Sequence, residues 1–350
     1  MSAGPKQYAE LHLHLGGAII PRILYTNVQR WKYDRVNPDR AELAAQYIKK
    51  YPTYEKFERK LIKPSDTLAQ YLEAHKVVEP LQTIDTLAYF VTRMLRGCHV
   101  FENLSYLELR FNPYFRLPKG LPINEIRPAM KEMISTIALA ASVSYREYPI
   151  VFTQILCMDS RLPKEINYEI LMAAKEMKDE VAAVDLAGPD DAYSAQAEDL
   201  LSLLELAKKQ GQKVTCHLFE TPMGCYPDFL QFCDRIGHGI QIPLRQPKLL
   251  TQVAKRKQCL EVCPTSYLRT GTIQSYAELR PVFTACFDLG IDIAVCTDNS
   301  AFHQVRLPVE FERLLTHKVI GFKEMERCRE AAFKHAFRWP GSIERRTGVM

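Results

Sequence analysis

The 350-residue chain is 47% hydrophobic and 25% charged, a composition that allows a packed core and excludes a largely disordered chain. The net charge of +5 comes from 46 basic and 41 acidic residues that mostly alternate in sign along helical segments, which argues against nucleic-acid binding. No run approaches the roughly 18 apolar residues of a membrane span, so we expect no membrane partner either.

Eight short apolar or β-branched runs are predicted to be strands. In chain order they cover 9–13, 104–111, 150–158, 181–186, 213–218, 235–237, 259–262 and 292–297. Helical patterns lie between most of them, such as the segment 195–210, which ends at Gly211. Strands that alternate with helices in this way predict an α/β fold, the (β/α)8 TIM barrel. The segment 20–99 is too long for one crossover helix, so we expect extra helices over the barrel mouth, within a single domain across 1–350.

The first predicted strand carries two histidines separated by one residue, His12 and His14. Because successive side chains of a strand point to opposite faces, both imidazoles project from the same side. Gly16 and Gly17 follow closely and allow a ligand to approach the backbone. This arrangement suits a metal held at the end of a strand.

Further polar side chains follow other predicted strands, at the end where the active site of such a barrel lies. His217 and Glu220 follow the fifth strand, His238 follows the sixth, and Asp298 and Asn299 follow the eighth. Three imidazoles and one carboxylate are a natural ligand set for zinc, which lowers the pKa of a coordinated water towards ~7. Glu220 and His238 fit the general acid and base that hydrolysis requires. The remaining histidines are expected to be surface or structural residues: His75, His99, His303, His317 and His335.

Seven strings along the chain resemble the adenosine deaminase family in their order and spacing. They are HLHLGGA (12–18), YLELRFNP (106–113), VDLAG (184–188), HLFE (217–220), RIGHG (235–239), EVCPTS (261–266) and TDN (297–299). Together they span nearly the whole chain and are far more specific than any single string. The resemblance implies a zinc-dependent aminohydrolase that converts an adenine nucleoside, adenosine or deoxyadenosine, to the 6-oxopurine and ammonia.

The resemblance also implies a role for each matching residue. One Zn²⁺ would be bound by four side chains: His12, His14, His217 and Asp298. Glu220 would donate a proton to purine N1, and His238 would position or deprotonate the attacking water. Asp298 would also orient that water. The Gly188 backbone would bind purine N3, and His14 would contact the substrate as well.

Three departures from the family pattern bear on the substrate. Gly16 stands where the family has an acidic residue that helps to hold the ribose 5′ hydroxyl, which leaves space for a different 5′ group. Asn299 stands where an aspartate contacts purine N7, and its amide can donate a hydrogen bond to that nitrogen. Leu218 and Phe219 enlarge the loop before Glu220, where we expect Phe219 to fill the core.

Three alternatives remain beside the nucleoside deaminase. The first is a deaminase of a 5′-substituted or N6-modified adenine nucleotide, whose phosphate could meet basic groups on the predicted lid: Lys56, Arg59, Lys60 and Lys63. A solvated helix face explains those residues more simply. The second is a zinc hydrolase that cleaves an amide or ester. The third is a non-catalytic purine-binding protein, which would have no need for Glu220.

The cysteines predict the cellular compartment. Ten of them are scattered along the chain without a Cys-x-x-Cys pair, which is typical of thiols in a reducing environment. The first residues lead straight into the first predicted strand, so we expect no signal peptide. We therefore expect a cytoplasmic protein.

Overall fold

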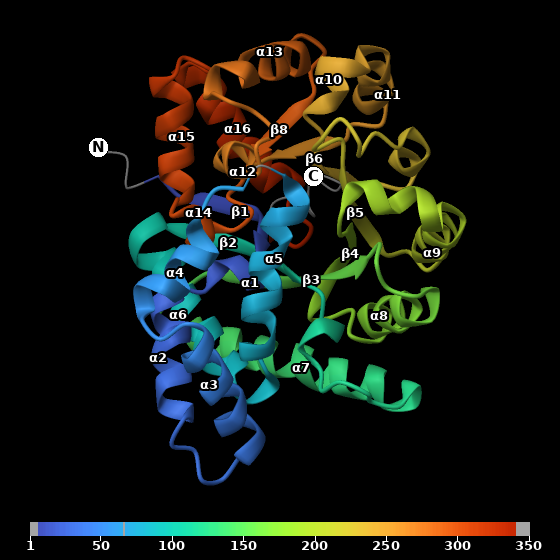
Figure 1. Ribbon diagram of the computed structural model, residues 1–350. Helices are drawn as coiled ribbons and strands as arrows, with labels where there is room; N and C mark the ends of the chain where they lie inside the picture. The colour runs from blue at the N-terminus through green and yellow to red at the C-terminus, as the bar shows by residue number, and fades with distance from the viewer. Residues whose placement is uncertain (1–5, 66, 341–350) are drawn as a thin grey trace.

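Eight parallel strands, hydrogen-bonded in chain order, form the centre of the fold (Figure 1). The computed structural model describes residues 6–65 and 67–340. The strands are β1 (Tyr8–His14), β2 (Leu104–Phe111), β3 (Val151–Asp159), β4 (Val181–Ala187), β5 (Lys213–Leu218), β6 (Arg235–His238), β7 (Cys259–Val262) and β8 (Asp292–Val295). Each begins and ends within two residues of its predicted bounds, and the predicted (β/α)8 TIM barrel is confirmed.

The barrel closes between β8 and β1 through the segment that follows β8. Leu13 and Asp298 form an isolated parallel bridge. Asp298 N donates to His12 O at 2.8 Å, and His14 N donates to Asp298 O at 2.7 Å. This closure fixes Asp298 beside the two histidines of β1, because their backbones are hydrogen-bonded directly.

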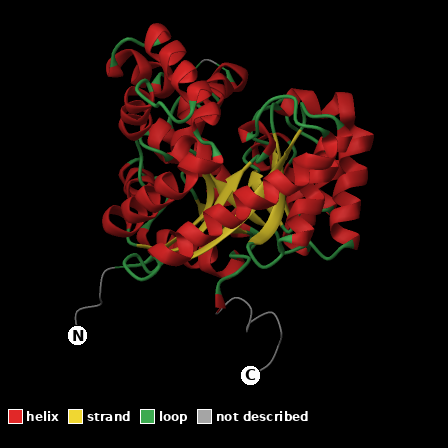
Figure 2. Cartoon of the chain, turned by 90° about the horizontal axis from the view of Figure 1, so that it is seen from below, coloured by secondary structure: helices red, strands yellow, loops and turns green. Residues whose placement is uncertain are grey.

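Helices surround the strands, as Figure 2 shows. Those that follow β2 to β8 are η2 (Tyr114–Arg116), α7 (Ile123–Ser144), α8 (Lys164–Glu176), η3 (Asp190–Gln196), α9 (Ala197–Lys209), η4 (Pro227–Gln231), α10 (Gln241–Arg245), η5 (Pro247–Leu249), α11 (Leu250–Lys255), α12 (Pro264–Arg269), η6 (Tyr276–Leu279), α13 (Arg280–Asp288), α14 (Ser300–His303), α15 (Leu307–Thr316) and α16 (Phe322–His335). The helix predicted at 195–210 is α9. Gly211 follows it with φ +74°, a left-handed conformation that glycine adopts readily. None of the described helices combines the length and the apolar character needed to span a membrane.

The segment between β1 and β2 forms the expected extra helices. They are α1 (Leu15–Ala18), α2 (Pro21–Trp31), α3 (Pro38–Lys50), α4 (Tyr54–Ile62), α5 (Leu68–Val78), η1 (Glu79–Leu81) and α6 (Ile84–Glu102). The side chains of Asn37, Thr53 and Thr67 cap the amino ends of α3, α4 and α5, each accepting from the backbone N–H three residues later. Of these elements, α5 contributes the most side chains to the pocket at the barrel mouth.

Candidate metal centre and active site

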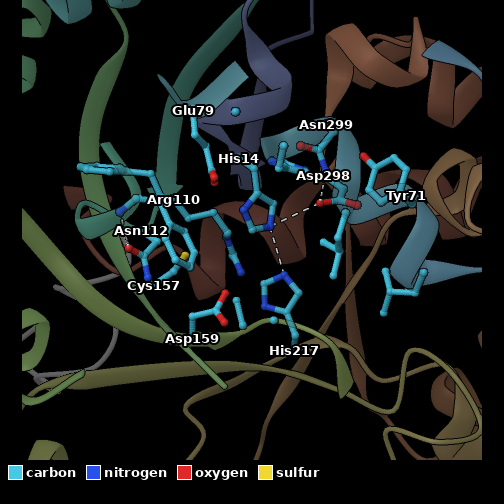
Figure 3. A pocket seen from close by; sticks show the side chains of 18 of the residues that line it. His14, Tyr71, Glu79, Arg110, Asn112, Cys157, Asp159, His217, Asp298 and Asn299 are labelled. Atoms are coloured by element: carbon cyan, nitrogen blue, oxygen red, sulfur yellow. Dashed lines mark hydrogen bonds and ion pairs between the residues drawn. The ribbon is translucent and has the colours of Figure 1, made fainter. Parts of the chain in front are cut away.

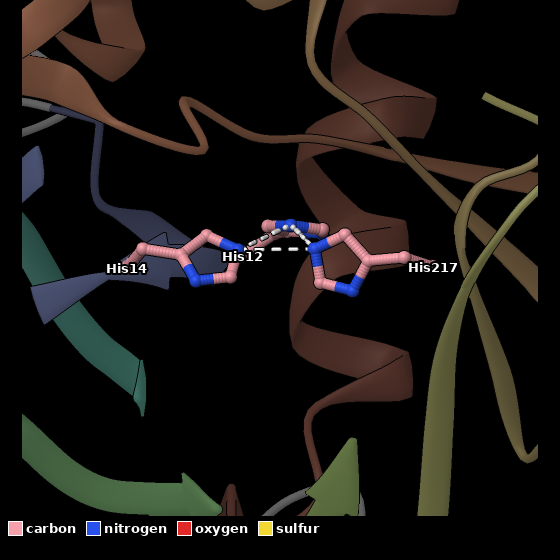
Figure 4. Close-up of side chains that lie close together, drawn as sticks. All are labelled: His12, His14 and His217. Carbon is pink, nitrogen blue, oxygen red and sulfur yellow. Dashed lines mark hydrogen bonds between the residues drawn. The ribbon is translucent and has the colours of Figure 1, made fainter. Parts of the chain in front are cut away.

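Three imidazoles converge at the carboxyl ends of β1 and β5 (Figure 4). Nε2 of His12 lies 3.1 Å from Nε2 of His217. Nε2 of His14 lies 3.3 Å from that of His12 and 3.0 Å from that of His217. Ring nitrogens that face one another as acceptors repel unless a cation lies between them. The structure thus brings the three predicted histidine ligands into a cluster that could hold a metal ion.

Two buried carboxylates orient two of these rings and select their tautomers. His12 Nδ1 lies 2.9 Å from Glu261 Oε2, and His217 Nδ1 lies 3.1 Å from Asp185 Oδ2. Each ring therefore donates its Nδ1–H to a carboxylate and keeps Nε2 for a metal. Sequence reasoning assigned no role to Asp185 or Glu261. Each of them is a single carboxylate inside an otherwise apolar strand. Because a buried carboxylate requires a partner, this pattern could have indicated that both residues pair with a buried group.

The protonation states of the histidines suit a metal site. Burial holds the pKa of His12 and His14 well below the usual range, so both imidazoles are neutral. Burial also acts on His217, but the charge and hydrogen bond of Asp185 outweigh it and raise the pKa of His217. A metal that binds Nε2 of His217 therefore competes with a proton.

Asp298 faces the same centre from the end of β8. Its Oδ1 lies 3.4 Å from His14 Nε2 and 3.7 Å from His12 Nε2. Its Oδ2 accepts a hydrogen bond from Ser266 Oγ at 2.6 Å, and Asn299 Nδ2 donates to Oδ1 at 2.7 Å. The Asp298 backbone has φ +61°, a left-handed conformation that is unfavourable for a residue other than glycine. Strain of this kind is concentrated at functional sites.

A buried ion-pair network lies beneath the histidines. Arg110 donates to Asp185 Oδ2 at 3.3 Å and to Glu261 Oε2 at 2.8 Å. Arg235 donates to Glu261 Oε1 at 2.6 Å and also to Glu108. All five side chains are fully buried. Burial alone would raise the pKa of Glu261, but the two guanidinium groups outweigh it and hold that pKa below its usual value.

The two residues predicted for acid–base chemistry, Glu220 and His238, lie side by side. Glu220 Oε2 is 3.4 Å from His238 Nε2, and the His238 ring centroid is 5.1 Å from that of His217. On its other side, His238 Nδ1 lies 3.3 Å from the Tyr267 hydroxyl. Burial lowers the pKa of His238 well below its usual value, so its neutral ring can accept a proton.

The enlarged loop before Glu220 fills the core, as expected for Phe219. The Phe219 side chain is fully buried. Its backbone N donates to Gly224 O at 2.8 Å, and its carbonyl accepts from Gln241 N at 2.8 Å. These contacts hold Phe219 at φ +56° and fix the turn that carries Glu220.

A pocket with about 710 Å³ of empty space, counted to its opening, lies over the cluster (Figure 3). The residues predicted to contact substrate all line it: His14, Gly16, Gly188 and Asn299. Gly188 has φ +105°, and a Cβ at this position would lie 2.5 Å from Ser160 Oγ. Only glycine therefore lets the backbone form this part of the wall.

His75, expected to be a surface or structural residue, lies at the pocket wall, where α5 brings its imidazole. Burial lowers the pKa of His75 to about 3. A Cβ at Gly16 would lie 2.5 Å from His75 Nδ1 and 3.7 Å from Arg116 Nη2. The empty space expected at Gly16 is therefore occupied by side chains from other elements.

Two other histidines are structural, as expected. His303 is buried, with Nε2 2.8 Å from the Tyr71 hydroxyl and Nδ1 3.1 Å from Thr297 O. His335 Nε2 lies 2.8 Å from Asp292 Oδ2, where α16 packs on β8. Both are held by protein partners outside the metal cluster.

The basic residues considered for a phosphate lie outside the pocket. Lys56 is exposed on α4. The other three line a separate surface groove: Arg59, Lys60 and Lys63. The guanidinium groups that line the pocket itself belong to other residues: Arg110, Arg116 and Arg161.

Known proteins share both the sequence pattern and the fold. The family model "Adenosine deaminase" matches residues 5–341. An adenosine deaminase from Clostridium kluyveri is 25% identical over 334 residues, which cover 94% of this chain and 88% of that protein. An amidohydrolase from Burkholderia ambifaria, solved with bound Zn, has a TM-score of 0.77 at 19% identity and covers 98% of this chain and 89% of its own. The N6-methyl-AMP deaminase of Arabidopsis thaliana has a TM-score of 0.73 at 20% identity, and the match covers 97% of this chain and 94% of that protein's chain. The chain belongs to the adenosine deaminase family, a family of aminohydrolases.

Proposed function

We propose that this protein catalyses zinc-dependent hydrolytic deamination of an adenine nucleoside, adenosine or deoxyadenosine, to the 6-oxopurine and ammonia. One observation carries the proposal: the converging histidines and the Glu220–His238 pair lie together at one pocket. A protein that only bound purines would have no use for an acid–base pair beside a metal site. The cysteines of the chain are free thiols, which supports a cytoplasmic location.

The proposed metal is one Zn²⁺, held by His12, His14, His217 and Asp298. Neutral imidazoles and a carboxylate are ligands that zinc prefers, and the zinc-containing neighbour with this fold supports the choice. When bound, the ion lowers the pKa of water towards ~7 and so makes a nucleophile available near neutral pH.

The protein's own residues would then move the protons. Glu220, protonated when the purine arrives, donates its proton to N1 and so makes C6 more electrophilic. His238 accepts a proton from the attacking water, which Asp298 orients, and the water oxygen forms a bond to C6. The C6–N bond then breaks. Of the two water protons, one leaves with ammonia through His238 and the other restores Glu220.

Two residues would orient the base without taking part in proton transfer. The backbone N–H of Gly188 donates to purine N3, and the Asn299 amide donates to N7. Their places in the pocket wall support these roles.

A deaminase of a 5′-substituted or N6-modified adenine nucleotide is the second candidate. It is favoured by the fold shared with N6-methyl-AMP deaminase and by Arg116 and Arg161 in the pocket wall. Both guanidinium groups already have acidic neighbours, Glu79 and Asp159, which makes the nucleoside the better candidate.

An ammonia-release screen tests the proposal. Its substrates are aminopurine nucleosides, nucleotides and N6-methylated analogues, with zinc measured on the same sample. We expect ammonia from adenosine or deoxyadenosine and about one zinc per chain. If zinc-loaded protein releases ammonia from no purine, the proposal fails.

The variant Glu220→Gln tests the acid. We expect kcat to fall by ~10²- to 10⁴-fold, because general acid catalysis is lost, while bound zinc is unchanged because Glu220 is not a ligand. Glu330→Gln, on the exposed face of α16, is the control and should keep full activity. Near-normal turnover by Glu220→Gln would contradict the mechanism.

A further inference from the structure

Two polar side chains of the inserted helices face the pocket without a hydrogen bond to any described residue. They are His75 on α5 and Glu79 on η1, about one helical turn apart. The Glu79 side chain is 16% exposed, and its one ion pair in the described chain is with Arg116, at 4.0 Å from Nη1 to Oε1. Figure 3 shows Glu79 pointing into the pocket.

The Glu79 carboxylate needs a hydrogen-bond donor. A largely buried acceptor without a donor is unfavourable, and burial raises the pKa of Glu79 against the opposing charge of Arg116. The same wall includes Gly16, where a Cβ would lie 2.5 Å from His75 Nδ1. The inserted helices therefore present a carboxylate and an imidazole at the wall where position 16 has no side chain.

The pairing of charges favours an uncharged sugar in this part of the pocket. Arg116 donates to Asn112 O at 2.7 Å and to Gln82 Oε1 at 3.0 Å. Arg161 makes a bidentate pair with Asp159, at 2.8 and 2.7 Å. Neither guanidinium can take up a phosphate without giving up part of these contacts.

We propose that Glu79, with His75 beside it, binds the 5′ hydroxyl of an uncharged adenine nucleoside and disfavours a 5′-phosphate. The inference rests on the proposed function, because it takes an adenine nucleoside as the ligand of this pocket. The Glu79 carboxylate accepts the hydrogen bond that an acidic side chain at position 16 would otherwise accept. A phosphate dianion in the same place meets a like charge.

The hydroxyl contact is tested by binding without turnover. The affinities of adenosine and 5′-deoxyadenosine are measured on protein carrying Glu220→Gln, with and without Glu79→Ala. Removing the hydroxyl should weaken binding about 10- to 100-fold when Glu79 is present, as expected for a hydrogen bond to a charged acceptor, and less than about 3-fold when it is absent.

Glu73→Ala is the matched control, since Glu73 is exposed on α5, the helix that leads directly into η1. It should keep the full discrimination between the two ligands. Circular dichroism would show that the proteins with and without Glu79→Ala are both folded. If they then discriminate equally between adenosine and 5′-deoxyadenosine, the proposed hydroxyl contact is overturned.

The charge effect is tested by ammonia release from adenosine and from AMP. Wild-type protein should prefer adenosine in kcat/KM, and Glu79→Gln should reduce that preference by about tenfold or more, mainly through the KM for AMP. A wild-type preference for AMP would overturn the inference and favour the second candidate, a nucleotide deaminase, while aminopurine deamination itself would stand. Ammonia from no purine would overturn the proposed function, and the binding measurements would still decide whether Glu79 holds the hydroxyl.

Discussion

Asn299 has an incomplete set of hydrogen bonds beside the candidate metal site. Its Nδ2 donates to Asp298 Oδ1 at 2.7 Å, while its Oδ1 is buried without a hydrogen bond to any described residue. A Cβ at Gly17 would lie 2.1 Å from that Oδ1, so the glycine makes room for the amide. The Nδ2 amide carries two protons, and Asp298 accepts one of them. The other remains for a ligand, which supports the proposed contact with purine N7.

The variant Asn299→Asp tests that contact. An aspartate donates to N7 only when its carboxyl is protonated, so at a pH where it is ionised the preference for adenosine over 7-deazaadenosine should fall by about 2- to 10-fold in kcat/KM. The ratio between the two substrates is the informative quantity, because it cancels effects on Asp298. An unchanged ratio would show that Asn299 does not contact N7.

At the scale of strands, the buried ion-pair network beneath the histidines supports the site. Arg235 on β6 joins Glu108 on β2 to Glu261 on β7, and all three are fully buried. Arg235→Met leaves two buried carboxylates without this partner. We expect the free energy of unfolding to fall by about 3–5 kcal/mol in denaturant titrations.

Arg96→Met, at an exposed position on α6, is the control for that substitution and should change stability by less than about 0.5 kcal/mol. A loss below about 1 kcal/mol for Arg235→Met would mean that the network is not important for folding.

The contact between β8 and α16 predicts a pH dependence. Asp292 Oδ2 lies 2.8 Å from His335 Nε2 and 2.7 Å from Lys334 Nζ. Burial tends to raise the pKa of Asp292, but these hydrogen bonds and charges outweigh it and hold that pKa well below its usual value. Because the folded-state pKa is the lower one, the ionised carboxylate stabilises the fold above the unfolded pKa of ~3.9, and this stability is lost as the pH falls.

Asp292→Asn should therefore lower the free energy of unfolding by about 1–2 kcal/mol at pH 7, with allowance for solvent screening of the partly exposed pair. The difference from wild type should shrink as the pH approaches 3. Denaturant unfolding at pH 7, 5 and 3 measures it. A difference that stays constant or grows towards low pH would contradict the assignment.

The strands were predictable from sequence because buried parallel strands are continuous apolar runs with polar residues at their ends. The candidate ligands were predictable for the same reason, since His217 and Asp298 stand at such ends. The carboxylates that pair with the histidine ligands were not predictable from sequence. Asp185 and Glu261 pair with histidines 32 and 249 residues away in the chain, and such pairings depend on barrel closure.

Across the whole molecule, the barrel and the inserted helices contribute different parts of the site. The barrel holds the histidine cluster and the Glu220–His238 pair, whereas α5 and η1 supply the wall that carries His75 and Glu79. Sequence alone could not place that wall, because the packing of the inserted helices, rather than their own periodicity, decides which face meets the pocket.

The central claim is that the histidine cluster holds the metal on which deamination depends. The most direct measurement is the rate of ammonia release from adenosine by protein of known zinc content, before chelation, after chelation and after zinc is restored. We predict a rate proportional to bound zinc, lost on chelation and recovered at about one zinc per chain. Folded, metal-free protein that keeps its full rate would contradict the claim.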